Sequence, residues 1–200
     1  MSPLERTLDE PVVEAIEEVL EETLALARFD RVLRAVGISG SPRAPSKSKT
    51  LAERLLDDLQ KLGAETRLID LAMMPAEALV ARETSADVDG ALAAIGQADI
   101  IIASSPTYRA LYTGVLKCFF DLMPTGHLVD KICVGLQTGI APAHSLAAEY
   151  GFRPLFASLE GLPLLVLYAT DSEFEDGQPN AALSEKLQDI ADRAVAAITP

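Results

Sequence analysis

Apolar runs and helical patterns alternate along most of the chain. Short runs rich in Val, Ile and Leu predict strands, and segments with an apolar residue every three or four positions predict helices. We predict strands at Val32–Ser39, Glu65–Asp70, Asp99–Ser104, Lys131–Gln137 and Leu164–Ala169. We predict helices at Thr50–Leu62, Ala86–Gly96, Thr113–Leu122, Ala143–Leu159 and Ala181–Ile198. This alternation predicts an α/β fold in which a doubly wound parallel sheet carries helices on both faces.

The N-terminal segment has a different character. Its first 30 residues hold nine acidic and two basic residues. After Pro11, apolar residues recur at helical steps as far as Ala27, which predicts an amphipathic helix with an acidic, solvated outer face. We therefore expect an N-terminal helical extension at 1–30 and one α/β domain at 31–200. Within that domain, Asp171–Asn180 is rich in acids, Gly and Pro and is expected to be the least ordered stretch.

Composition excludes several classes of function. The formal net charge of −13 disfavours binding to nucleic acid or to an anionic membrane surface. No apolar run approaches the ~20 residues of a membrane span, and no signal pattern opens the chain, so we expect a cytoplasmic protein. The two cysteines and two histidines are too few for a disulfide framework or a structural metal site.

A ligand is expected at the loops after the first, third and fourth strands. In an open parallel sheet, ligands bind beyond the carboxyl ends of the strands, where the strand order reverses. For five doubly wound strands this point lies between the first and third strands. The loops Ser39–Lys49 and Ser104–Tyr112 flank it, and Thr138–His144 is expected nearby.

The first of these loops concentrates hydroxyl groups and positive charge in an acidic chain. It reads GSPRAPSKSKT at residues 40–50, and Gly40 is expected to allow a sharp turn after the strand. The following helix N-terminus offers free N–H groups and partial positive charge, which together bind anions. Further donors for a phosphate dianion come from Ser41, Arg43, Ser46, Lys47, Ser48, Lys49 and Thr50. The glycine spacing of dinucleotide and triphosphate loops is absent, so we predict a terminal phosphate; a polar turn with helix-capping hydroxyls is the alternative.

The second loop, Ser104–Gly114, follows three consecutive isoleucines. Pro106 is expected to end the strand. Tyr108 offers a flat face for a ring system, and Arg109 places a charge beside it. A tyrosine half-buried against the fold is the plainer interpretation. Together with a phosphate loop across the same crevice, the pattern favours a planar phosphorylated cofactor such as FMN.

Three segments resemble the NADPH-dependent FMN reductase family of flavodoxin-like proteins. GSPRAPSKS is similar to the family's phosphate loop, and SPTYRALYTGVLK to its isoalloxazine loop and following helix. TGIAPAHSLAAEYGFRPL resembles the stretch after its fourth strand. The resemblance covers about Arg31 to the C-terminus and is nearest to the flavin reductases that feed alkanesulfonate monooxygenases. It implies a flavodoxin-like sheet of order 2-1-3-4-5, preceded here by an acidic helix that the family pattern lacks.

The resemblance also implies roles for individual residues. It assigns Ser41, Arg43, Ser46 and Ser48 to the FMN phosphate, Pro106, Thr107, Tyr108 and Arg109 to the border of the flavin ring, and Thr138 and Gly139 to its far edge. Ile140 stands where this subgroup often has a second glycine. NADPH or NADH is the implied hydride donor, and a separate monooxygenase is an implied recipient of reduced flavin. Family members are generally homodimers or homotetramers, with the helix after the flavin loop at an interface.

The predicted function is an NAD(P)H-dependent FMN reductase. Hydride transfer between a nicotinamide and a flavin needs no protein nucleophile, so we expect no catalytic triad or carboxylate pair. Arg109 and backbone N–H groups near Thr138 and Gly139 are candidates to stabilise charge that develops on the flavin. His144 is expected at a helix start or an interface. The alternatives are a flavin-bound quinone or metal-ion reductase, a flavodoxin-like electron carrier and a flavin-free scaffold.

Overall fold

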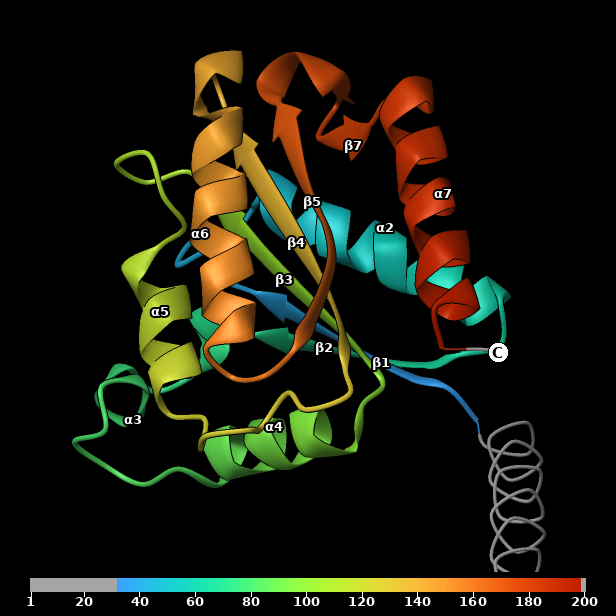
Figure 1. Cartoon of the computed structure of the whole chain (residues 1–200). Coiled ribbons are helices and arrows are strands. Elements are labelled where there is room, and N and C mark those ends of the chain that lie inside the picture. The colour runs from blue at the N-terminus through green and yellow to red at the C-terminus, as the bar shows by residue number, and fades with distance from the viewer. Residues whose placement is uncertain (1–31, 199–200) are drawn as a thin grey trace, which may run out of the picture.

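Five parallel strands form the central sheet of the computed structural model, which describes residues 32–198. The strands are β1 (Arg34–Ser39), β2 (Glu65–Asp70), β3 (Ile100–Pro106), β4 (Ile132–Gly139) and β5 (Leu162–Thr170). Their order in the sheet is β2-β1-β3-β4-β5, and every neighbouring pair is parallel (Figure 1). The predicted doubly wound sheet is therefore confirmed, and its order reverses between β1 and β3.

Helices cover both faces of this sheet (Figure 1). On one face, α2 (Lys47–Lys61) packs beside α7 (Ala181–Ala196). The other face is covered by α4 (Ala86–Gln97), α5 (Gly114–Asp121) and α6 (Ser145–Ala157). The shorter elements are η1 (Leu71–Met73), α3 (Ala76–Leu79), η2 (Pro142–His144), η3 (Asp171–Glu173), β6 (Phe174–Glu175) and β7 (Gln178–Pro179).

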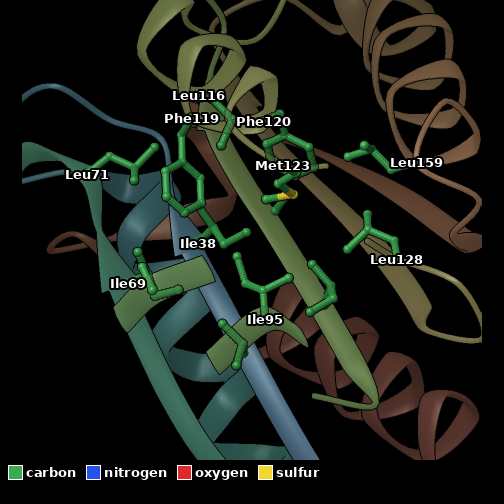
Figure 2. Close-up of a cluster of buried hydrophobic side chains, with 14 of the residues drawn as sticks. Ile38, Ile69, Leu71, Ile95, Leu116, Phe119, Phe120, Met123, Leu128 and Leu159 are labelled. Carbon is green, nitrogen blue, oxygen red and sulfur yellow. The ribbon is translucent and has the colours of Figure 1, made fainter. Parts of the chain in front are cut away.

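The isoleucine run of β3 explains why both faces need cover. Ile100 and Ile102 belong to the core cluster that includes α2 and α7, whereas Ile101 belongs to the cluster that includes α4, α5 and α6. Figure 2 shows the cluster that includes α4, α5 and α6, in which Phe119 of α5 points toward Ile38 of β1. Each fully buried large apolar side chain contributes about 1.5–3 kcal/mol, so this core fixes the strand ends from which the loops emerge.

The helix after β3 is partly a core element. Phe119 and Phe120 are buried, so core packing accounts for the apolar face of α5 at these two positions. The Phe120 ring lies against α6, with the Phe120 and Phe156 centroids 6.1 Å apart. This packing anchors α5 directly behind the loop that ends at Thr113, its N-cap.

Several element boundaries differ from prediction. β3 and β5 end later than predicted, at Pro106 and Thr170, and three further differences change where the loops lie. α2 begins at Lys47 rather than Thr50, because Ser46 is its N-cap. β4 extends to Gly139, so Thr138 and Gly139 belong to the strand. The helix predicted from Ala143 begins as a 3-10 turn and becomes α-helical only at Ser145.

The segment Asp171–Asn180 is structured, so the expectation that it is the least ordered stretch was wrong. It forms η3 and the antiparallel pair β6–β7. Glu173 closes a capping box with Thr170 and pairs with Lys186 of α7 at 2.9 Å. Two of the acidic residues that suggested disorder, Asp171 and Glu173, are ion-pair partners, and Glu173 is also a cap, which composition alone does not reveal.

The predicted N-terminal helix at 1–30 lies outside the described residues, and so does the domain boundary placed after it. Within residues 32–198, no helix combines the length and the apolar character that crossing a bilayer requires.

Candidate functional site

One cavity, of about 880 Å³, lies at the carboxyl ends of β1, β3 and β4, where the strand order reverses. Its walls are formed by Ser41, Arg43, Pro45, Ser46, Lys47, Pro106, Thr107, Tyr108, Arg109, Ala110, Thr138, Gly139, Ile140, His144 and Asp171. Nine of the ten residues that the resemblance assigns to FMN are among them, and Ser48 is the exception. The fold therefore brings together three loops that are distant in the sequence.

A second cavity, of about 810 Å³, lies at the opposite edge of the sheet. Leu33, Asp99 and Lys131, which precede β1, β3 and β4, contribute to its walls. No predicted site residue lies there, and ligands of doubly wound sheets bind at the carboxyl edge. The first cavity is therefore the candidate functional site.

The N-terminus of α2 opens into the candidate site. Ser46 Oγ accepts a hydrogen bond from the Lys49 N–H at 3.4 Å, which satisfies one backbone donor of the first turn. Ser48 is fully buried, and its hydroxyl oxygen lies 2.9 Å from Ser46 Oγ. Ser48 thus holds Ser46 in position, while Ser46 itself faces the cavity.

Ser41 shapes the loop between β1 and α2. Its hydroxyl donates to the Arg43 carbonyl at 2.9 Å and accepts from the Arg43 N–H at 3.3 Å. The Ala44–Pro45 peptide bond in this loop is cis. Gly40 is not in a left-handed conformation, and a Cβ there would lie 2.8 Å from Leu116 Cβ. Glycine is thus needed at this position for close packing against α5.

Two residues expected to face an anion turn elsewhere. Lys49 pairs with Asp70 at 2.8 Å, and this hydrogen bond, opposed by desolvation, raises the pKa of Lys49. Thr50 Oγ1 donates to the Ser46 carbonyl at 3.2 Å. Neither residue lines the cavity, so the cationic side chains that this loop and α2 contribute to it are Arg43 and Lys47.

Tyr108 and Arg109 lie on a tight turn after β3. The Tyr108 and Leu111 backbones exchange hydrogen bonds of 2.8 and 3.2 Å. The two residues between them, Arg109 and Ala110, have φ values of 52° and 68°, a left-handed region that costs a non-glycine residue about 1–2 kcal/mol. Tyr108 is 39% exposed, and the Arg43 guanidinium carbon lies 6.0 Å from the centroid of its ring. Tyr108 therefore forms a wall of the cavity and lies outside both core clusters.

The far wall is built where β3 and β4 end. The Thr107 N–H donates to the Thr138 carbonyl at 2.7 Å, which ties the two strand ends together. Behind them, the buried Gln137 donates from Nε2 to Thr107 Oγ1 at 2.9 Å. Sequence reasoning missed Gln137, although a polar side chain inside an apolar strand was the available signal.

The rim holds two further residues that the predictions did not include as ligands. Asp171, directly after β5, pairs with Lys47 at 2.9 Å. Its position at the carboxyl edge was the signal that could have identified it. His144 lies in η2, at the start of the helical segment as expected, and it also lines the cavity. In the described part of the chain, no three His, Cys, Asp or Glu side chains group in a way that could hold a metal ion.

The site combines two kinds of surface. Arg43, Lys47 and the first turn of α2 provide positive charge and N–H donors at one end. Tyr108 and Ile140 provide apolar and aromatic surface elsewhere on the wall. This combination suits a planar ligand that carries a phosphate group.

Comparisons with curated proteins agree on one family. The sequence profile of the family described as NADPH-dependent FMN reductase matches residues 33–176. The NADH-dependent FMN reductase SfnF of Pseudomonas fluorescens (strain Pf0-1) is 35% identical over 172 residues, covering 83% of this chain and 92% of that protein. The FMN reductase (NADPH) of Escherichia coli (strain K12) is 33% identical over 165 residues, covering 82% of this chain and 86% of that protein.

Comparisons with solved structures show which fold the chain shares. The apo form of the NADH:FMN oxidoreductase EMOB superposes with a TM-score of 0.75 and 30% identity, covering 83% of this chain and 90% of that chain. The Streptococcus pneumonia TIGR4 flavodoxin has a TM-score of 0.57 and 15% identity, covering 83% of this chain and 99% of that chain. The flavodoxin comparison shows a shared fold alone, so the fold is flavodoxin-like.

Proposed function

The chain belongs to the NADPH-dependent FMN reductase family, and from this premise we propose that FMN binds in the cavity at the carboxyl edge of the sheet. The protein is an FMN reductase that uses NADH or NADPH as its hydride donor. The observation that carries the assignment of the site is the N-terminus of α2, which opens into the cavity between Arg43 and Lys47.

The phosphate of FMN suits this end of the cavity. A phosphate monoester carries about −1.5 to −2 charges at pH 7 and accepts several hydrogen bonds. The backbone N–H groups of the first turn of α2, the Ser46 hydroxyl and the Arg43 guanidinium supply donors of the matching sign. Ser41 and Ser48 would act on the phosphate indirectly. The Ser41 hydroxyl donates to the Arg43 carbonyl and so shapes the loop, and the Ser48 hydroxyl is hydrogen-bonded to that of Ser46.

The flavin ring would occupy the remainder of the cavity, bordered by Pro106, Thr107, Tyr108 and Arg109 on one side and by Thr138 and Gly139 on the other. When bound, FMN supplies the hydride-accepting chemistry of the reaction. Tyr108 provides an aromatic face that orients a planar ring. The Arg109 guanidinium would supply a positive charge that stabilises negative charge on the bound flavin.

We also propose a destination for the reduced flavin, which is a separate monooxygenase. The resemblance to flavin reductases of two-component systems supports this proposal, as does the similarity to the reductase named SfnF. The acidic surface, with a net charge of −13, suits docking to a partner with a basic face.

A homo-oligomer in the cytoplasm is the proposed form of the protein, with residues 1–30 as an extension of the domain. Ile140, Leu146 and Tyr150 expose 83%, 66% and 77% of their surface. Ile140 borders the cavity, and Leu146 and Tyr150 lie one turn apart on α6. Large exposed apolar side chains such as these suit contact with a second copy of the chain.

Steady-state oxidation of NADH and of NADPH by the purified protein, with and without added FMN, tests the proposal. FMN is expected to be reduced with a lower KM than riboflavin, because only FMN can use the phosphate end of the cavity. Oxidation that does not depend on FMN, or equal KM values for the two flavins, would contradict the assignment of the site.

A further inference from the structure

Asp171 places a negative charge in a cavity that is proposed to bind an anion. The charged side chains that line the cavity are Arg43, Lys47, Arg109 and Asp171, so Asp171 is the single carboxylate among the described lining residues. Its Oδ1 lies 2.9 Å from Lys47 Nζ, and Lys47 is the first residue of α2. A cation that stands at the phosphate end of the cavity is thus already paired with an acid of the protein itself.

The position of Asp171 is fixed by its neighbours. Thr170, the last residue of β5, pairs with Gly139 at the end of β4. The Thr170 N–H donates to Glu173 Oε2 at 2.8 Å, and Glu173 Oε1 accepts from Lys186 Nζ of α7 at 2.9 Å. η3 is therefore tied to both β5 and α7, which holds the Asp171 carboxylate at the rim of the cavity.

Lys47, by contrast, can exchange partners. Its Nζ lies 5.3 Å from the centroid of Phe174, which belongs to the same segment as Asp171. The side chains of Lys47 and Asp171 are 37% and 48% exposed, and ion pairs with this much solvent access are weak. A flexible lysine chain could therefore leave Asp171 for a phosphate placed at the N-terminus of α2.

We propose that Asp171 limits the affinity for FMN by competing with the phosphate for Lys47. The proposal rests on FMN occupying this cavity, as proposed above. Asp171 lowers affinity in two ways: the phosphate must displace it from Lys47, and its charge stays near a dianion. The effect acts on the phosphate, so it lowers the affinity for FMN and not for riboflavin. Weakened binding suits a flavin that is reduced as a substrate and then leaves for another protein.

Asp171→Asn tests the competition, with Asp176→Asn as the matched control. Both variants remove one negative charge from the same segment, but Asp176 does not line the cavity. The Kd values of FMN and riboflavin are measured by titration calorimetry, and folding is checked by thermal denaturation. We expect Asp171→Asn to lower the Kd of FMN about three- to fivefold, the upper part of the range of a partly exposed charge interaction. The control should change it less than twofold, and the Kd of riboflavin should stay constant.

Two further measurements separate electrostatic competition from a structural effect. At about 0.5 M salt the gain from Asp171→Asn should shrink, because exposed charges are screened. In a Lys47→Gln background the gain in FMN affinity from Asp171→Asn should fall by at least half, because Asp171 and the phosphate no longer compete for an ammonium group. An undiminished gain in that background would overturn the competition for Lys47.

The outcomes distinguish this proposal from the assignment of the site. If wild type prefers FMN to riboflavin but Asp171→Asn binds FMN no more tightly than Asp176→Asn, the role of Asp171 is wrong and the site stands. If wild type and both variants bind FMN and riboflavin equally, the phosphate assignment fails, and the role of Asp171 fails with it.

Discussion

Gln137 Nε2 donates a hydrogen bond to Thr107 Oγ1 at 2.9 Å, although Gln137 lies on β4 and Thr107 follows β3. Gln137 is fully buried, and its Oε1 has no hydrogen-bond partner among the described residues. An amide nitrogen can only donate, so the Thr107 oxygen accepts and its own proton is free to point into the cavity. Gln137 thereby makes Thr107 a donor toward a ligand.

Thr107→Val is expected to lower both activity and stability. The variant removes the donor to the ligand and leaves both polar atoms of the buried Gln137 amide unpaired, a loss of about 1–3 kcal/mol. We expect kcat/KM for FMN reduction to fall roughly tenfold, less than for a dedicated oxyanion donor. Urea denaturation and steady-state kinetics measure the two effects. Thr107→Ser keeps the hydroxyl and should stay within about twofold of wild type. Unchanged kinetics in Thr107→Val would mean that Thr107 donates to no reacting ligand.

Gly139→Ala is expected to distort the far wall of the site. A Cβ at this position would lie 2.2 Å from Tyr168 Oη and 2.9 Å from Thr107 Oγ1. Tyr168 cannot retreat freely, because its hydroxyl donates to the Ala141 carbonyl at 3.0 Å. Overpacking of this kind costs about 1–3 kcal/mol.

Loss of thermal stability and at least a tenfold rise in the Kd of FMN are the expected results for Gly139→Ala. The double variant Gly139→Ala, Tyr168→Phe lacks the oxygen of the closest contact and should recover part of both losses, whereas Tyr168→Phe alone should have a small effect. If the double variant binds FMN no better than Gly139→Ala, contact with Tyr168 Oη is not the cause.

Arg43→Ala should weaken the binding of FMN without affecting the fold. Arg43 is exposed, lies in the loop before α2 and lines the cavity. A hydrogen bond between charged groups is worth about 1.5–3 kcal/mol, so the Kd of FMN should rise roughly ten- to hundredfold. Riboflavin, which lacks the phosphate, should bind as it does to wild type. Arg67→Ala removes another exposed arginine, on β2 away from the cavity, and serves as the control. Equal losses of affinity for FMN and riboflavin would indicate that Arg43 contacts the flavin ring and not the phosphate.

The fold could be predicted because its signals are local. Ile100, Ile101 and Ile102 leave no polar face, so a strand at this position must be covered by helices on both sides. The location of the site followed from the same reasoning, since the reversal of strand order brings the loops after β1 and β3 together. Neither inference depends on where an individual side chain points.

The orientation of individual side chains could not be predicted, because it depends on where each element begins. α2 begins at Lys47 and not at the predicted Thr50. In this helix Ser48 is buried, and Lys49 pairs with Asp70. Successive helical positions are about 100° apart, so an error of three residues in a helix start reassigns every side chain of the first turn. The pairs Lys47–Asp171 and Thr107–Gln137 join residues that are distant in the sequence, and no local pattern encodes them.

The two cysteines should differ sharply in reactivity. Cys133, on β4, is fully buried, and burial raises the pKa of its thiol to about 12. At pH 8 only about 10⁻⁴ of this thiol is thiolate, the form that reacts with alkylating reagents. Cys118, on α5, is partly exposed. Mass spectrometry after treatment of the native protein with iodoacetamide at pH 8 should therefore find one label, on Cys118, and denaturation in urea should allow a second. Cys118→Ser should remain unlabelled until it is denatured. Rapid labelling of Cys133 in that native variant would show that β4 opens to solvent, which a buried interior strand of this sheet should not do.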